Sequence, residues 1–435
     1  MRYIPETKRE QEQMLQDIGL NSVDELYSMV PKEVLLKELD IPEGKSEMEV
    51  LEDLQKIAGK NLVYDQIYRG AGVYKHYIPT IVSYITSKEE FLTAYTPYQA
   101  EISQGVLQSI FEYQTQICEL TGLDVSNASV YDGAVAAAEA LFMTLERNRD
   151  EVLVSDTIDP QTLEVMKTYC ESRNVKLTLL KGKDHKTDIE EVRAHLNERT
   201  AGLYVESPNY YGLIEDVEEL TKLVHENKTK MIEGVDPISL AIYKTPGEMD
   251  VDIAVGEGQQ LGLPMGFGGP YLGFMTCKKE LMRRLPGRIV GETTDHEGRR
   301  AYVLTLQARE QHIRREKASS NICSNEALCA MTASVYMAAM GPEGMEKLAL
   351  SCYNNAHYLQ AKLNELGFVR KDEGEFFDEF LTSTPIDAEV LEKKLSERKI
   401  LSGLKVEDQI LWCATEVNTK DKIDELCLAL KEVLS

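Results

Sequence analysis

Apolar residues recur every three or four positions in the first part of the chain. In residues 1–66 this spacing predicts helices, and Ser22 with Glu25 and Ser46 with Glu49 each match a capping box at a helix start. The segment is therefore predicted to be a helical arm. Two aromatic and polar stretches without a clear period, 68–79 and 95–99, are predicted to be loops. A long amphipathic helix is expected after them, with its apolar face made of Ile102, Val106, Ile110, Tyr113, Ile117 and Leu120.

From about residue 130 to 256, short apolar runs alternate with helical stretches. Helices are expected near 160–173, 188–198 and 216–228, and Thr187 with Glu190 matches a cap for the second. Short buried strands that alternate with helices predict a mostly parallel α/β sheet, whose ligands bind at the carboxyl ends of the strands. The runs expected to form strands are Val152–Val154, Val175–Leu180, Leu203–Val205, Met231–Ile232 and Ile253–Val255.

The pattern changes again near residue 325 and predicts a smaller α+β domain. The expected division is an N-terminal helical arm (1–66), a large α/β domain (67–324) and a small C-terminal domain (325–435). In the last domain, two helices (325–340 and 342–366) precede an apolar segment (376–382), a helix (387–398), a strand (409–414) and a final helix (420–434).

Composition narrows the possible partners. The 435 residues include 48 basic and 73 acidic side chains, a net charge of −25 that disfavours nucleic acids and anionic membranes as partners. The eight cysteines form no C-x-x-C pair and the seven histidines show no metal-ligand spacing, so no metal site is predicted. Reduced thiols and the lack of an apolar leader favour the cytoplasm.

One segment, 278–317, is basic in this acidic chain, with eleven basic and six acidic side chains. It is either a solvated surface or a docking site for an anionic partner. At its end, His312, Arg315 and Lys317 are crowded together, and arginine can bind a carboxylate with two hydrogen bonds. The alternative is a surface helix in which Glu310 and Glu316 pair with these cations.

Several polar or glycine-rich segments are candidates for chemistry. Asp132 and Gly133 precede an alanine-rich helix, where Asp132 is expected to cap the helix; a phosphate cradle is the less favoured reading, because the carboxylate would repel a phosphate. The segments 206–212 and 233–237 follow predicted strands and are either site residues or turns. The glycine density of 256–270 indicates close approach of the backbone to a ligand or another chain.

Five of these segments, in this order, resemble glycine dehydrogenase (decarboxylating), the P-protein of the glycine cleavage system. The length and the opening MRYIP resemble the alpha subunit of the two-subunit bacterial form. The resemblance implies a fold-type-I pyridoxal-phosphate-dependent transferase fold, similar to aspartate aminotransferase. The segments are GAGVYKHYIP, YTPYQAEISQG, YDGAVAAAEA, GEGQQLGLPMGFGGP and REKASSNICSN.

The family's reaction, as the resemblance implies it, decarboxylates glycine on pyridoxal phosphate and passes the aminomethyl group to the lipoyl arm of the H-protein. At the position of the family's Schiff-base lysine this sequence has Gln259, and Glu233 matches the aspartate that pairs with the pyridinium nitrogen. The resemblance therefore implies a vestigial pocket (Asp132, Gly133, Glu233 and Gln259) in a chain inactive by itself. A lysine-bearing beta subunit would hold the cofactor covalently, in a heterodimer or heterotetramer.

In this fold type, active sites lie between subunits. The residues expected to reach the partner's pocket are Tyr95, Thr96, Tyr98 and Gln99, with His312, Arg315, Lys317 and Asn321 as weaker candidates for the substrate entry or the H-protein dock. The alternative is that the aromatic residues only pack the interface. Two other functions stay open: an independent pyridoxal-phosphate enzyme, and a scaffold or regulatory protein without chemistry.

Overall fold

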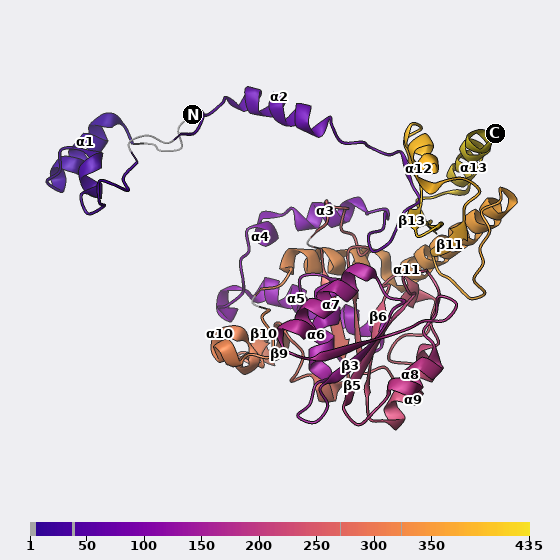
Figure 1. The fold of residues 1–435 in the computed structure, drawn as a ribbon. Coiled ribbons are helices and arrows are strands. Elements are labelled where there is room, and N and C mark those ends of the chain that lie inside the picture. The colour runs from indigo at the N-terminus through magenta and orange to yellow at the C-terminus, as the bar shows by residue number, and fades with distance from the viewer. Residues whose placement is uncertain (1–5, 37–39, 270, 323) are drawn as a thin grey trace. The chain divides into compact units, whose positions relative to one another are not determined.

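The computed structural model describes residues 6–36, 40–269, 271–322 and 324–435. It divides into two compact units, one ending at Leu62 and one spanning Val63–Ser435 (Figure 1). Both Pro270, in the glycine-rich segment, and Cys323 lie outside the described residues. The seven described cysteines are free thiols.

The first unit is helical, as the apolar spacing predicts. It contains α1 (Lys8–Asp17), a 3-10 turn η1 (Val23–Tyr27) and α2 (Glu47–Ala58). Ser46 and Glu49 form the predicted capping box. Ser22 lies at the N-cap position of η1 as predicted, but its side chain makes no cap hydrogen bond, and Glu25 accepts a hydrogen bond from Asn21 N (3.4 Å).

A seven-stranded sheet forms the centre of the second unit, and its mostly parallel character confirms the predicted fold class. β3 to β7 are parallel to one another, whereas β8 runs antiparallel to both of its neighbours, β7 and β2. The strand order is β2 (Val125–Ser126), β8 (Gly273–Cys277), β7 (Ile253–Glu257), β6 (Lys230–Val235), β5 (Thr200–Ser207), β3 (Glu151–Ser155) and β4 (Lys176–Leu180).

Helices cover both faces of this sheet, which explains why its strands are apolar on both sides. Alternate side chains point to opposite faces: Val152 and Ile232 pack with α6 (Gly133–Thr144) and α7 (Pro160–Ser172), whereas Leu153 and Met231 pack with α8 (Ile189–His195) and α9 (Val217–Glu226). The cap of α8 is Asp188, one residue after the predicted Thr187.

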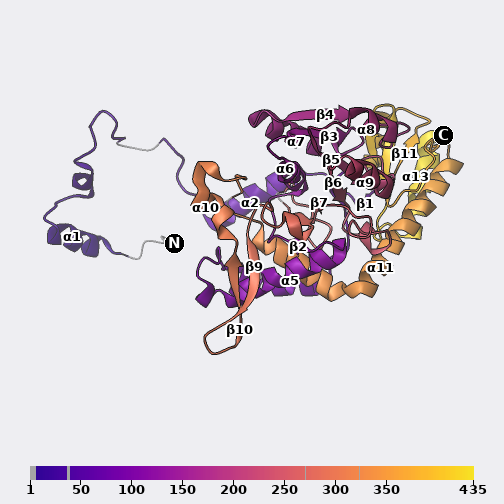
Figure 2. The same cartoon turned by 90° about the horizontal axis from the view of Figure 1, so that it is seen from below.

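The predicted amphipathic helix is α5 (Gln104–Thr121), which packs beside α11 (Ala327–Glu365) and the antiparallel hairpin of β9 (Ile289–Thr294) and β10 (Arg300–Thr305). Ile102 lies before the helix in the turn η2 (Ala100–Ile102) and is 81% exposed, so its expected place on the buried face is wrong. In Figure 2 the turn of the hairpin projects away from the seven-stranded sheet. The remaining short helices of this unit are α3 (Thr80–Thr86), α4 (Glu89–Leu92), α10 (Gln311–Arg314), η3 (Ser239–Ala241), η4 (Lys279–Leu281), η5 (Gln307–Arg309) and η6 (Arg315–Lys317).

The C-terminal residues form the α+β pattern that the sequence predicts. α11 changes direction at Gly341, whose backbone is non-helical (φ 63°, ψ 173°) and which precedes Pro342, so two predicted helices meet there. The three-stranded sheet β11 (Glu379–Ser383), β14 (Gln409–Cys413) and β13 (Leu404–Val406) packs with α12 (Ala388–Ser396) and α13 (Lys420–Leu434). β1 (Gln66–Ile67) pairs with β12 (Ile400–Leu401). The expected domain boundaries after residues 66 and 324 stay predictions.

None of the helices in the described part of the chain combines the length and the apolar character that crossing a membrane requires.

Candidate functional site

A cavity of about 370 Å³ lies at the carboxyl ends of β5, β6 and β7, where ligands of an α/β sheet bind. Each of these strands contributes a carboxylate: Glu206 in β5, Asp236 just after β6 and Glu257 at the end of β7. The loop 71–74, the starts of α6 and α7, the segment after β5, Tyr271 and Glu379 also line the cavity. Residues of the sequence segments 132–133, 206–212, 234–237 and 256–269 therefore meet at this edge, although the segments are far apart in the chain.

Two carboxylates accept hydrogen bonds from backbone N–H groups at the start of α6. Asp132 is the N-cap residue, and its side chain accepts a hydrogen bond from Val135 N (2.8 Å), which confirms the predicted cap. Gly133 N donates to Glu257 Oε2 (3.0 Å). A side chain at position 133 would bring its Cβ to 3.0 Å from the Glu257 backbone N and Cβ, so the close approach of Glu257 requires glycine there.

Glu257 accepts three hydrogen bonds, all from backbone N–H groups. In addition to Gly133 N, the backbone N–H groups of Gln259 and Leu272 donate to its Oε1, both at 3.0 Å. Burial raises the pKa of this carboxyl to about 7, and the hydrogen bonds from the backbone oppose the rise only in part.

Gln259, at the lysine position of the resembled family, is only 2% exposed and all its amide groups are used. Its oxygen accepts from Tyr74 N (3.0 Å), and its amide nitrogen donates to Tyr74 O (3.0 Å) and Leu263 O (2.8 Å). This side chain therefore fastens the loop 71–74 to the glycine-rich segment.

Pyridoxal phosphate, the cofactor that the fold type implies, does not fit these residues. The first N–H groups of α6 already donate to carboxylates, where a phosphate would need them. Among the described residues that line the cavity there is no lysine, arginine or histidine. Burial also raises the pKa values of Glu206 and Glu379 to about 7. The six acidic residues of the wall are Asp132, Asp159, Glu206, Asp236, Glu257 and Glu379.

Glu233 lies elsewhere, which corrects its expected place beside Asp132, Gly133 and Gln259. Because side chains alternate along β6, it points to the face covered by α9 and lines a second cavity of about 470 Å³ with Glu215 and Tyr243. Its Oε2 has no hydrogen-bond partner among the described atoms, and burial raises its pKa well above the ordinary value.

The residues predicted to reach a partner are at the surface. Tyr95 is 84% and Tyr98 59% exposed, in the segment between α4 and η2, whereas Thr96 is half-buried and Gln99 is exposed. The Tyr98 ring lies 5.5 Å from the Arg288 guanidinium. None of the four lines the cavity of this chain. Their role toward a partner stays a prediction.

The weaker candidates His312, Arg315, Lys317 and Asn321 are also exposed and lie outside the cavity. His312 Nδ1 is 3.5 Å from Glu310 Oε2, one of the contacts that the surface-helix alternative expects, but the helix here has only four residues (Gln311–Arg314). The surrounding basic segment is less open than its charge suggests. Arg288 is only 4% exposed and donates to Asn325 Oδ1 (3.2 Å), so it is not a surface docking residue in this chain.

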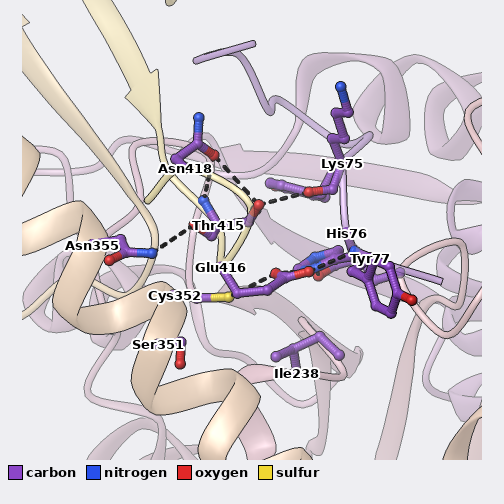
Figure 3. A network of polar contacts seen from close by, with 12 residues as sticks. Lys75, His76, Tyr77, Ile238, Ser351, Cys352, Asn355, Thr415, Glu416 and Asn418 are labelled. Carbon is purple, nitrogen blue, oxygen red and sulfur yellow. Dashed lines mark hydrogen bonds and ion pairs between the residues drawn. The ribbon is translucent and has the colours of Figure 1, made fainter. Parts of the chain in front are cut away.

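A second polar cluster surrounds His76 (Figure 3). The sequence did not indicate this cluster. His76 Nδ1 is bonded to Glu416 Oε2 (2.7 Å) and Nε2 to Gln260 Oε1 (3.0 Å), and Gln260 Nε2 donates to Asp236 in the cavity wall. Burial lowers the pKa of His76, but the hydrogen bond and charge of Glu416 outweigh it, and the net pKa is raised. Local spacing gave no signal because 340 residues separate His76 from Glu416.

Comparisons with known proteins agree with this fold. The family model of the glycine cleavage system P-protein matches residues 1–430. A protein of Moorella thermoacetica named "Probable glycine dehydrogenase (decarboxylating) subunit 1" is 47% identical over 445 residues, covering 100% of both chains. The crystal structure of a glycine decarboxylase (P-protein) of the glycine cleavage system, in inhibitor-bound form, is 43% identical, covers 100% of both chains and has a TM-score of 0.94.

A more distant solved structure shows the fold alone. Alanine–glyoxylate aminotransferase from Nostoc sp. is 16% identical, with a TM-score of 0.60 over 93% of this chain and 98% of its own. The fold is that of fold-type-I pyridoxal-phosphate-dependent transferases. On the match over nearly its whole length, the chain belongs to the glycine cleavage system P-protein family.

Proposed function

We propose that this chain is the alpha subunit of a two-subunit glycine dehydrogenase (decarboxylating), and that it holds no cofactor itself. The complex decarboxylates glycine, releases CO2 and passes the aminomethyl group to the lipoyl arm of an H-protein. One observation supports this separate role: carboxylates occupy the start of α6 in the cavity wall, and Gln259, at the lysine position, is bonded to the loop 71–74. The relatives' designation as subunit 1 supports a second subunit. We assign to that subunit the Schiff-base lysine and the pyridoxal phosphate.

Exposed apolar surface supports contact with that second subunit. In α2, Leu51, Leu54 and Ile57 are each more than half exposed, and no residue of α1 or α2 is buried. Apolar helix faces of this kind are normally covered by another protein surface. We assign the second subunit as the cover, with Tyr95, Thr96, Tyr98 and Gln99 directed to its pocket. The assembly as a heterotetramer and the cytoplasmic location belong to this proposal.

The H-protein dock belongs to the same proposal. In the basic segment, Arg283, His312, Arg315 and Lys317 are exposed and available to an acidic partner. Charge reversal of Arg283 and Lys317 is expected to weaken binding of an acidic carrier, most strongly at low salt. An unchanged affinity would place the dock elsewhere.

Reconstitution tests the proposed function. The chain is purified alone and together with a lysine-bearing second subunit, pyridoxal phosphate is added, and the internal-aldimine absorbance and glycine–bicarbonate exchange are measured. Both signals are expected only from the mixture. An aldimine on the isolated chain that borohydride reduces would overturn the proposal, and a mixture without exchange would favour a scaffold or regulatory role.

A tyrosine pair tests the contribution to the partner's pocket. Tyr95→Phe removes one hydroxyl from the reconstituted complex, and loss of a hydrogen bond to substrate or cofactor is expected to lower kcat/KM about tenfold. The matched control is Tyr84→Phe, since Tyr84 in α3 is also exposed (61%). Equal kinetics for both variants would leave Tyr95 as an interface residue only.

A further inference from the structure

Three side chains of the types that bind transition metals meet where three segments converge. His76 comes from the loop before α3, Cys352 from α11 and Glu416 from the segment after β14 (Figure 3). Their ligand atoms all lie within 4.8 Å of one another. The His76 side chain is 2% and the Glu416 side chain 17% exposed, and Cys352 is fully buried. We propose that His76, Cys352 and Glu416 form a zinc-binding site.

The donor set selects the metal. An imidazole nitrogen, a thiolate sulfur and a carboxylate oxygen are all zinc ligands, whereas magnesium and calcium require oxygen ligands throughout. Three protein ligands leave a fourth tetrahedral position for water. Glu416 is the most exposed of the three side chains, at 17%.

Two of the three distances between ligand atoms can be compared directly with those around a bound ion. Zinc bonds of about 2.0–2.3 Å in a tetrahedron place ligand atoms about 3.3–3.6 Å apart. Cys352 Sγ lies 3.6 Å from Glu416 Oε2, which already meets this spacing. The 2.7 Å between His76 Nδ1 and Glu416 Oε2 is a hydrogen-bond distance and has to lengthen by about 0.6 Å to admit the ion.

The proton balance keeps the buried charge constant. Because Gln260 Nε2 donates to Asp236, its Oε1 faces His76 and accepts from Nε2–H, and the second imidazole proton then lies between Nδ1 and Glu416. Zinc displaces this proton and the thiol proton of Cys352. Two protons leave to solvent as one Zn²⁺ enters, so the net charge of the site does not change. Binding of the ion therefore does not require the burial of an additional net charge.

Groups behind the ligands are already placed to orient them. Gln260 fixes the outer nitrogen of His76, and Tyr77 N donates to the outer oxygen of Glu416 (2.6 Å). Such partners set ring orientation and ligand basicity in zinc sites. A bound ion would link three segments: the loop of His76, which is continuous with the cavity wall, the helix α11, and the segment that follows β14.

Cobalt is the direct probe of the site. The full chain is freed of metal with a chelator and titrated with Co²⁺ alone, and the thiolate-to-cobalt charge-transfer band and the visible bands of tetrahedral cobalt are recorded. One equivalent of Co²⁺ is expected to produce both, and Zn²⁺ should abolish them by displacement. A titration without a thiolate band overturns the proposal, whatever other weak binding it reveals.

Variants locate the ion. Cys352→Ser is expected to lose the charge-transfer band, whereas Cys170→Ser, at an equally buried thiol in α7, should keep it. A band that persists in Cys352→Ser contradicts the proposed site. For the wild-type protein, Zn²⁺ should slow alkylation of Cys352 in mild denaturant at least tenfold and leave Cys170 unaffected. If Zn²⁺ leaves the alkylation rate of Cys352 unchanged, the proposal is also refuted. This measurement uses only the wild-type protein, so it does not depend on the folding of a variant.

Discussion

Glu257→Gln is the substitution that best tests the acidic character of the cavity. Glu257 is half-buried at the end of β7, against the start of α6, and its two oxygens accept hydrogen bonds from three backbone N–H groups. Glutamine has nearly the same shape but cannot ionise. The substitution therefore removes one titrating group from the cavity wall and keeps most of the packing.

The magnitude follows from the pKa of this carboxyl, which burial raises from 4.5 to about 7. The folded protein therefore holds the proton more tightly than the unfolded chain does, and stability is fully present below pH 4.5 and is lost as the pH rises through 7. At about 1.4 kcal/mol for each tenfold change in proton affinity, the loss from Glu257 is on the order of 3 kcal/mol. The variant lacks this loss, but its amide nitrogen faces Gly133 N, and the unmet N–H costs about 1–3 kcal/mol at every pH.

The assay is urea unfolding of both proteins at pH 4.5, 6, 7 and 8.5. The variant should be less stable at low pH, and the difference should shrink or reverse by on the order of 3 kcal/mol toward pH 8.5. Glu206 and Glu379 titrate in both proteins and cancel in the comparison. Two parallel curves would refute the reasoning, because the pKa of Glu257 would then be the same in the folded and the unfolded protein.

Three further substitutions test separate parts of the structure. Asp132→Ala removes the side-chain cap of α6 and is expected to destabilise the chain by about 1 kcal/mol, measured by thermal unfolding; no change would mean that the cap contributes nothing. Gln259→Lys is expected to lower the melting temperature, because a buried amide with three hydrogen bonds is lost, and to form no aldimine with pyridoxal phosphate in the isolated chain; an aldimine absorbance would show that the cavity accepts the cofactor. Leu54→Asp in α2 should weaken association with the second subunit in gel filtration without changing the melting temperature of the isolated chain, since Leu54 is 57% exposed there; unchanged association would remove α2 from the interface.

Local sequence signals predicted the elements well where apolar periodicity and capping chemistry agree. The runs around Val152, Leu203 and Ile253 became central strands because they are apolar on both faces, which only a sheet covered on both sides can bury. Predictions failed at segment ends. Ser22 occupies the N-cap position of a 3-10 turn without a side-chain cap hydrogen bond. Thr187 has the right residue type for a cap, but α8 begins one residue later, and Asp188 accepts the hydrogen bond from Glu190 N.

The sequence by itself determined the alternation of strands and helices, the cap at Asp132 and the glutamine at position 259, because each depends on residue type and local spacing. Only the tertiary structure decided what these residues face. Because side chains alternate along β6, Glu233 points toward a second cavity on the other face of the sheet. The close approach of β7 to α6 places the Glu257 carboxylate at the N-terminus of that helix. Chain folding also joined His76 to Cys352 and Glu416. Such contacts depend on the register and packing of distant segments, which local patterns do not encode.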